Sequence, residues 1–224
     1  MELANNHDRL GSSIKDPVSA LTHATGALLA AIGLVVLLRA GTGDPWRLAS
    51  FAVFGVSLIA LYTASAVYHW LRLSEPATAV LRRVDHTMIF VLIAGTYTPL
   101  CLGPLRGPWG WSLFGVVWGV AAAGLLMKLF WLQAPRWLST GVYVVMGWLV
   151  VVATAPLLRA VPAGGLAWLL AGGLFYTAGA VVYALKWPGR RARVFGFHEL
   201  FHLLVLAGSL SHFWVVYRYL GRLG

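Results

Sequence analysis

Long apolar stretches alternate with short polar joints along almost the whole of this 224-residue chain. Seven of the stretches approach or exceed the roughly 20 residues that a helix needs to cross the hydrocarbon of a bilayer. The joints carry glycine, proline and charged residues that interrupt helices, as in RAGTGDPWR and KWPGRRAR. The predicted spans are residues 18–39, 48–71, 84–103, 109–131, 138–158, 165–186 and 197–219. The pattern therefore predicts an all-α integral membrane protein built as a seven-transmembrane helix bundle.

Composition agrees with this class and excludes an ordinary soluble domain. Hydrophobic residues make up 59% of the chain and charged residues 11%, against roughly a quarter charged in soluble proteins. The first seventeen residues are polar and lack the apolar core of a signal peptide, so we predict a short cytoplasmic tail. Residues 18–221 are predicted to form a single transmembrane domain. The single cysteine, Cys101, is expected to be a packed small apolar residue.

The positive charge of the chain predicts its orientation rather than a nucleic-acid partner. The net charge is +10, but the basic residues lie between the apolar spans. Counted on alternate sides of the spans, eleven Lys and Arg residues share the side of the N-terminus and six lie on the other side. Cytoplasmic loops are enriched in these residues, so the N-terminus is predicted to be cytoplasmic and the C-terminus outside. This orientation is the reverse of that of a G-protein-coupled receptor.

Three of the predicted spans carry titratable side chains at one depth, near their cytoplasmic ends. His69 lies near the end of the second span, Asp85 begins the third, and His198 and His202 occupy the first two turns of the seventh. Ser65 lies one helical turn from His69 on the same face. Ionisable groups are costly inside hydrocarbon, so these residues are candidates for function.

Three imidazoles at one level predict a zinc site, because three protein ligands leave a fourth position open for catalysis. His198 and His202 are four residues apart, about 6 Å along one helix face, and both can reach one ion. We predict His69, His198 and His202 as ligands of Zn²⁺. Asp85 is predicted to act as a general base on water, and Ser65 to orient that water or a substrate oxygen.

The segment FHELFHLL also contains H-E-x-x-H, the metalloprotease pattern of two zinc ligands and a glutamate base. Its extended form requires glycine at position 205 and histidine at position 208, whereas this chain has Val205 and Gly208. No Asp or Glu follows Glu199, so the third ligand must come from upstream. Glu199 points about 100° around the helix from the preceding histidine. We expect it to face Arg193 or solvent, and we rank Asp85 above it as the base.

The remaining candidates keep structural alternatives. Asp85 can instead cap the start of the third span, where a carboxylate is favourable. His86 points about 100° away from Asp85 and is expected to pack or to support the site indirectly. For His23, near the inner end of the first span, support of the metal site and a plain helix contact stay equally open. His212 lies about 15 Å beyond His202, and an interhelical hydrogen bond is favoured over a polar stripe lining a cavity.

These motifs together resemble a known family. SAVYHWL, DHTMIFVLIAGTYTPL and FHELFHLLVLAGSLSHF, in this order, closely resemble the haemolysin III proteins, the bacterial branch of the progestin and adipoQ receptor family. DPVSALTHATGALLAAIGLVVLL looks like the opening segment of that family, so the resemblance covers nearly the whole chain. It implies a seven-helix bundle in the bacterial cytoplasmic membrane with zinc near the inner leaflet. By position, the motif residues are Ser65, His69, Asp85, His198 and His202.

Two functions stay open at this stage. The family is similar to alkaline ceramidases, which implies metal-dependent hydrolysis of lipid amides or esters, and its eukaryotic receptors bind adiponectin or steroids. We therefore favour a zinc-dependent membrane hydrolase with a membrane lipid as substrate or ligand. The alternative is a non-enzymatic sensor or regulator of membrane homeostasis in which zinc is structural. A channel or ion transporter ranks last, because it would need more ionisable residues in the middle of the membrane.

Overall fold

Helices make up all the regular structure in the residues that the computed structural model describes, which are 14–131, 135–189 and 195–222. The long helices are α1 (Pro17–Ala40), α2 (Pro45–Trp70), α3 (Glu75–Leu102), α4 (Pro108–Phe130), α7 (Ala163–Leu185) and α8 (Phe197–Arg218). A seventh segment consists of α5 (Arg136–Trp148), the 3₁₀ helix η2 (Leu149–Ala153) and α6 (Thr154–Ala160). A short 3₁₀ turn, η3 (Leu220–Arg222), follows α8.

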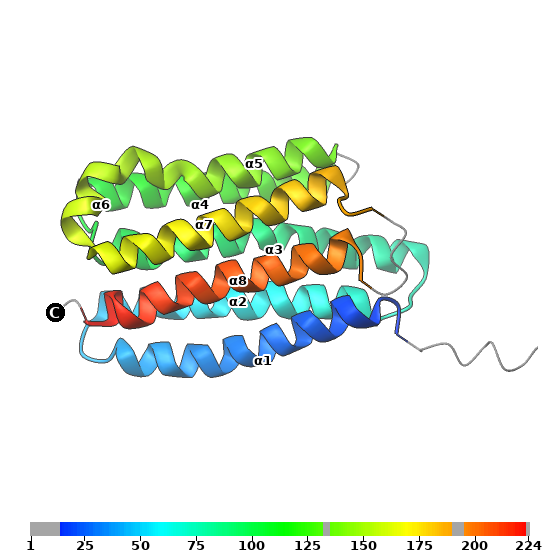
Figure 1. Ribbon diagram of the computed structural model, residues 1–224, viewed down its shortest axis with the longest axis horizontal. Coiled ribbons are helices and arrows are strands. Elements are labelled where there is room, and N and C mark those ends of the chain that lie inside the picture. The colour runs from blue at the N-terminus through cyan, green and yellow to red at the C-terminus, as the bar shows by residue number, and fades with distance from the viewer. Residues whose placement is uncertain (1–13, 132–134, 190–194, 223–224) are drawn as a thin grey trace, which may run out of the picture.

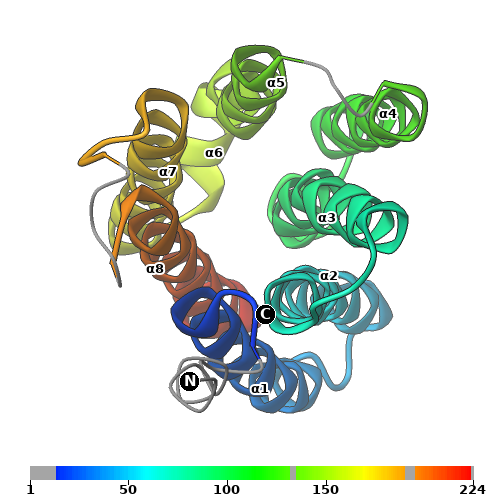
Figure 2. The same ribbon diagram turned by 90° about the vertical axis from the view of Figure 1, so that its right-hand side faces the viewer.

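The helices run up and down along one axis, so that consecutive segments are antiparallel (Figure 1). Seen along this axis they form a ring in the order α1, α2, α3, α4, α5, α7 and α8, with α8 returning to α1 (Figure 2). This order brings the start of α1, the end of α2 and the start of α8 to the same end of the bundle. Segments that are far apart in the sequence are thereby brought together at that end.

Six of the helical segments are long and apolar enough to cross a membrane, by length and composition. Their outer faces carry large exposed apolar side chains, such as Leu28 at 63% and Phe130 at 86% exposed. The helix outside this set is α3, whose first half carries Glu75, Arg82, Arg83 and Asp85. It packs between α2 and α4 along the same axis. The described part of the chain thus has the helices of an integral membrane protein, six of which are able to cross a membrane.

The predicted spans agree closely with the helices, with one clear exception at α3. This helix begins at Glu75, about two and a half turns before the predicted start at residue 84. Asp85 therefore lies inside the helix, where the backbone N–H groups are already bonded, and the alternative that it caps the helix is wrong. Of the predicted tail, only residues 14–17 belong to the described part of the chain.

The fifth segment changes from α to 3₁₀ geometry at η2, just before Pro156. Proline has no N–H group and its ring collides with the carbonyl group four residues earlier, so the regular ladder cannot continue. Tyr97 on α3 compensates for the irregular backbone. Its hydroxyl oxygen lies 3.0 Å from the carbonyl oxygen of Met146 and 2.7 Å from that of Gly147, and accepts from the N–H group of Val150 at 2.9 Å.

Two glycines allow close helix packing at the faces that surround the interior. A Cβ atom at Gly26 on α1 would lie 2.8 Å from a methyl carbon of Leu206 on α8. A Cβ atom at Gly172 on α7 would lie 2.3 Å from the ring of His212 on α8. Small residues at these positions allow helix backbones to approach closely.

Candidate metal centre

Three histidines from two helices converge at the end of the bundle where α1 begins. His69 comes from the last turn of α2, and His198 and His202 from the first two turns of α8. One ring nitrogen of each lies within 4.8 Å of the others. Among the residues described, no other group of three or more His, Cys, Asp or Glu side chains meets this condition. The structure therefore brings together the three residues that the sequence predicted as ligands, across 129 residues of chain between His69 and His198.

Two of these nitrogens have nearly the spacing of ligands around a tetrahedral ion. The Nε2 atoms of His69 and His198 are 3.1 Å apart. Two nitrogens at the usual zinc distance of roughly 2.0–2.1 Å lie about 3.3–3.4 Å apart in a tetrahedral site. His202 is 1% exposed, and its Nδ1 atom is buried without a hydrogen-bond partner. Neutral imidazoles with free lone pairs are common zinc ligands, so this donor set fits the predicted metal.

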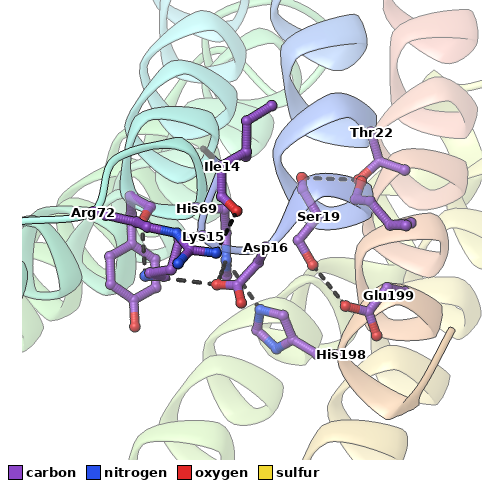
Figure 3. Close-up of polar contacts among 11 residues, drawn as sticks. Ile14, Lys15, Asp16, Ser19, Thr22, His69, Arg72, His198 and Glu199 are labelled. Carbon is purple, nitrogen blue, oxygen red and sulfur yellow. Dashed lines mark hydrogen bonds and ion pairs between the residues drawn. The ribbon is translucent and has the colours of Figure 1, made fainter. Parts of the chain in front are cut away.

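Asp16 supports His69 from the side away from the other histidines. Its Oδ2 atom lies 2.8 Å from His69 Nδ1, while His69 Nε2 faces His198 (Figure 3). A carboxylate on the second ring nitrogen of a histidine is the usual support of a metal ligand, because it fixes the tautomer and the ring orientation. The neighbouring Lys15 donates to the carbonyl oxygen of Tyr68 at 2.8 Å. Burial lowers the pKa of Lys15, although the adjacent Asp16 opposes this shift.

Glu199 has a structural role rather than a place among the ligands. One carboxylate oxygen accepts from the Ser19 hydroxyl group at 2.9 Å (Figure 3). The other accepts from the backbone N–H group of Gly196 at 2.9 Å. Glu199 thus caps the start of α8 and ties that helix to α1. The predicted alternative partner, Arg193, lies outside the described residues.

A cavity of about 740 Å³ opens beside the histidines and extends into the bundle. All three histidines line it, together with side chains from α1, α3, α5 and α7. Its far end is lined by Tyr176 on α7, Tyr97 on α3 and His212 on α8. The candidate centre therefore faces an internal space rather than a closed protein shell.

Asp85 and Ser65 lie on the wall of this cavity, close to each other. The side chain of Ser65 lies near enough to the Asp85 carboxyl group to influence it electrostatically. Both residues are buried, with Asp85 8% exposed and Ser65 1% exposed. Asp85 is not part of the group of ligand atoms that lie within 4.8 Å of one another. The structure thus separates the carboxylate from the three imidazoles while keeping both on one cavity.

The remaining histidines take three different positions. His23 stacks on His202 with ring centroids 3.6 Å apart, so it packs directly against a candidate ligand. The backbone carbonyl oxygen of His86 accepts from Tyr143 at 3.0 Å, and its side chain lines the cavity. His212 bonds the carbonyl oxygen of Gly208 at 2.8 Å, one turn earlier in its own helix. The Nδ1 atom is thus used within α8, and the cavity-lining alternative matches the position of His212.

Asp16 is the site residue that the sequence did not reveal. Its position before Pro17 marks the start of a helix, and an aspartate there is expected to cap that helix. The observed side chain makes no capping bond and turns to His69 instead. The absence of the capping bond can be seen only in the structure, so the sequence gave no direct sign of the contact between Asp16 and His69.

Comparison with known proteins identifies the family of this chain. The family model described as Haemolysin-III related matches residues 12–213. The chain belongs to this family. It is 38% identical over 210 residues to the hemolysin-3 homolog of Bacillus subtilis (strain 168), covering 92% of this chain and 95% of the relative. It is 36% identical over 216 residues to hemolysin-3 of Bacillus cereus, covering 94% of each.

A more distant relative extends the family to animals. The human monocyte to macrophage differentiation factor is 27% identical over 213 residues, covering 90% of this chain and 82% of the relative. The human relative is of the progestin and adipoQ receptor type. The family assignment that the sequence motifs predicted for this chain is therefore confirmed. The names of these haemolysin III relatives describe a haemolysin and a differentiation factor, which are different roles. Any reaction must therefore be argued from the site itself.

Proposed function

We propose that this haemolysin III protein is a zinc-dependent membrane hydrolase that cleaves a lipid amide or ester. The observation that carries the proposal is the cluster of His69, His198 and His202 on the wall of a cavity of about 740 Å³. A structural zinc site is usually closed by four protein ligands, whereas a catalytic site has three and keeps one position open. Three imidazoles beside an internal space correspond to the second arrangement.

The residues around the cavity supply the other parts that hydrolysis needs. Zinc held by the three imidazoles would polarise a carbonyl group and lower the pKa of water toward roughly 7. Asp85 would accept the proton of the attacking water and later deliver it to the leaving group. Ser65, the neighbour of the Asp85 carboxyl group, would hold the water or the substrate oxygen in line. Asp16 would keep the His69 ring in its orientation.

The orientation of the bundle determines where the reaction would take place. We propose seven spans, with α3 as the one that carries charge at its cytoplasmic end, a cytoplasmic N-terminus and an external C-terminus. The excess of Lys and Arg on the N-terminal side supports this orientation, eleven against six. The histidine cluster would then lie at the inner leaflet. Water would reach it from the cytoplasm, and an acyl chain would extend into the bundle.

Two measurements on purified protein test the proposal. Elemental analysis is expected to find one zinc ion per chain. A panel of lipid amides and esters is then tested with the wild type and with Asp85→Asn. Because Asp85 lies outside the ligand cluster, the variant should keep the metal and lose turnover by about 10²-fold or more.

The same measurements distinguish a hydrolase from the alternative, a membrane regulator with a structural zinc ion. Equal metal content together with equal behaviour of wild type and Asp85→Asn, in the lipid panel and in cells, would favour a membrane regulator with a structural ion. Loss of the metal in Asp85→Asn would instead give the carboxylate a ligand role. Absence of zinc from the wild type would contradict both functions.

A further inference from the structure

The start of α1 contacts both of the helices that carry the clustered histidines. Asp16 reaches His69 on α2 at 2.8 Å, and Ser19 donates to Glu199 on α8 at 2.9 Å. In the view of the site, the two contacts leave the same stretch of α1 in different directions (Figure 3). Helix α1 packs against α2 and against α8, and it lies between them in the ring (Figure 2).

Asp16 differs from the residue that matches it best in this chain. Asp44 also precedes a proline at the first position of a helix, and its Oδ1 atom caps α2 by accepting from Trp46 N at 2.9 Å and Arg47 N at 3.2 Å. Asp16 makes no capping bond within α1. Asp44 therefore serves as a helix cap, whereas the side-chain contact of Asp16 is the one with His69.

Backbone contacts fix the position from which Asp16 acts. The N–H group of Asp16 donates to the carbonyl oxygen of His69 at 2.9 Å, and that of Lys15 donates to the carbonyl oxygen of Trp70 at 3.3 Å. Lys15 Nζ donates to the carbonyl oxygen of Tyr68 at 2.8 Å. The last carbonyl groups of a helix have no partner inside it, and here residues 15 and 16 supply those partners. The segment is thus held against α2 in one register.

We propose that the start of α1 is a clamp that joins the two halves of the metal site, with Asp16 and Ser19 as its positioning residues. The inference rests on the proposed metal site. Asp16 accepts from His69 Nδ1, which leaves the Nε2 lone pair directed toward His198. Ser19 holds Glu199, and through it the first turn of α8, where His198 and His202 lie. Neither residue touches the ion or a substrate.

The first arm of the test removes the charge at Asp16. Purified Asp16→Asn and Asp44→Asn are loaded with Co²⁺ as a spectroscopic probe, and zinc affinity is measured by competition with a chelator. Asp16→Asn is expected to bind zinc about 10-fold to 100-fold more weakly and to change the visible Co²⁺ spectrum. Asp44→Asn removes an equivalent carboxylate at the other end of α2 and should match the wild type in both measurements.

The second arm removes the contact to α8. Ser19→Ala is compared with Ser50→Ala, because both serines are buried, at 0% and 1% exposed, and the Ser50 hydroxyl group donates to the carbonyl oxygen of Arg47 in its own helix. Zinc affinity should fall several-fold in Ser19→Ala alone. Far-UV circular dichroism of each variant checks that it is folded. If Asp16→Asn and Ser19→Ala bind zinc as the wild type does, the clamp is refuted while the metal site stands. If the wild type binds no zinc or Co²⁺, both fail.

A second, independent feature of the cavity is a buried cation. Lys128 on α4 is 3% exposed, and its Nζ atom donates to Ser139 Oγ at 2.5 Å. No carboxylate lies within ion-pair distance of it in residues 14–131, 135–189 and 195–222. Lys128, Arg82, Ser139 and Thr140 all line the cavity that contains the histidines.

The geometry points to an oxyanion subsite formed by Lys128, Arg82 and the hydroxyl groups of Ser139 and Thr140. A buried ammonium group without a countercharge is strongly unfavourable, and a bound anion would remove this cost. The ligand expected at this subsite is a phosphate-like or carboxylate group with several acceptor oxygens. It would come from the anionic group of a membrane lipid or from a free anion, and two probes distinguish these sources.

Thermal stability in the presence of each probe tests the subsite, because a ligand that binds the native state raises Tm. The probes are inorganic phosphate in neutral detergent, and nanodiscs of phosphatidylglycerol against phosphatidylcholine. We compare the wild type with Lys128→Met and with Lys186→Met, which removes the same charge outside the cavity lining. A rise in Tm with phosphatidylglycerol or with phosphate that disappears in Lys128→Met alone supports the subsite and identifies the source. No rise with either probe, or an equal rise in Lys128→Met, overturns it.

Discussion

The rings of His23 on α1 and His202 on α8 stack face to face, with centroids 3.6 Å apart and planes 8° from parallel. Both ring nitrogens of His23 are buried without hydrogen-bond partners in the described part of the chain. His23 also meets the edge of the Tyr62 ring, at a centroid distance of 5.1 Å. The contact therefore resembles an aromatic support behind His202 more than a polar one.

His23→Phe is predicted to keep zinc affinity within about threefold and to raise stability. Phenylalanine keeps the ring stack and removes two unpaired buried nitrogens, a gain of about 1 kcal/mol or more. For a chain of this size this corresponds to a rise in Tm of roughly 2–4 °C. Thermal unfolding and chelator competition measure the two effects. A large loss of zinc affinity would instead show that the His23 nitrogens take part in the site.

His69→Ala, His198→Ala and His202→Ala are each predicted to lose most of the bound zinc. Two remaining imidazoles cannot supply the three protein ligands of a catalytic site. His212→Ala is the matched control, because it lines the same cavity and lies outside the cluster of ligand atoms. Elemental analysis after equal purification gives the zinc content. Normal zinc content in any of the first three variants would remove that residue from the ligand set.

The helices were largely predictable because each apolar run had to be long enough to cross the hydrocarbon, which leaves little freedom in placing its ends. The start of α3 could not be predicted in this way. Residues 75–83 form a helix that carries polar and basic side chains, so they lack the continuous apolar pattern of a membrane span. The 3₁₀ break in the fifth segment was not predicted either, and the Tyr97 hydroxyl group that stabilises it comes from another helix. That pairing is a tertiary contact.

In the candidate site, too, some residues could be predicted from local sequence patterns and others only from the folded structure. The spacing of His198 and His202 on one helix face is local, and the depth of His69 follows from the alternation of the spans. These relations predicted the three histidines. The contact between Asp16 and His69 joins residues 53 positions apart and replaces a capping bond that the sequence favours, so no local pattern predicts it.

Labelling of single cysteines is predicted to confirm the orientation of the bundle. The native Cys101 is fully buried and is replaced by alanine to give a silent background. Thr42→Cys in the α1–α2 joint should react with an impermeant maleimide in intact cells, whereas Leu73→Cys in the α2–α3 joint should react only after the membrane is opened. Both positions are exposed in the structure. The reverse labelling pattern would place the histidine cluster at the outer leaflet.

Ser65→Ala is predicted to lower turnover by about 10-fold to 100-fold while zinc content stays unchanged. The hydroxyl group neighbours the Asp85 carboxyl group on the cavity wall and lies outside the ligand cluster, so its loss disturbs the orientation of the base and not the metal. Ser57→Ala is the matched control. Ser57 is buried on the same helix and bonds the carbonyl oxygen of Phe54 at 2.7 Å, away from the cavity lining. Steady-state kinetics on a lipid substrate of the wild type should show a fall in kcat for Ser65→Ala alone. An equal fall in both variants would trace the effect to packing of α2, and no fall in either would leave Asp85 to act without this partner.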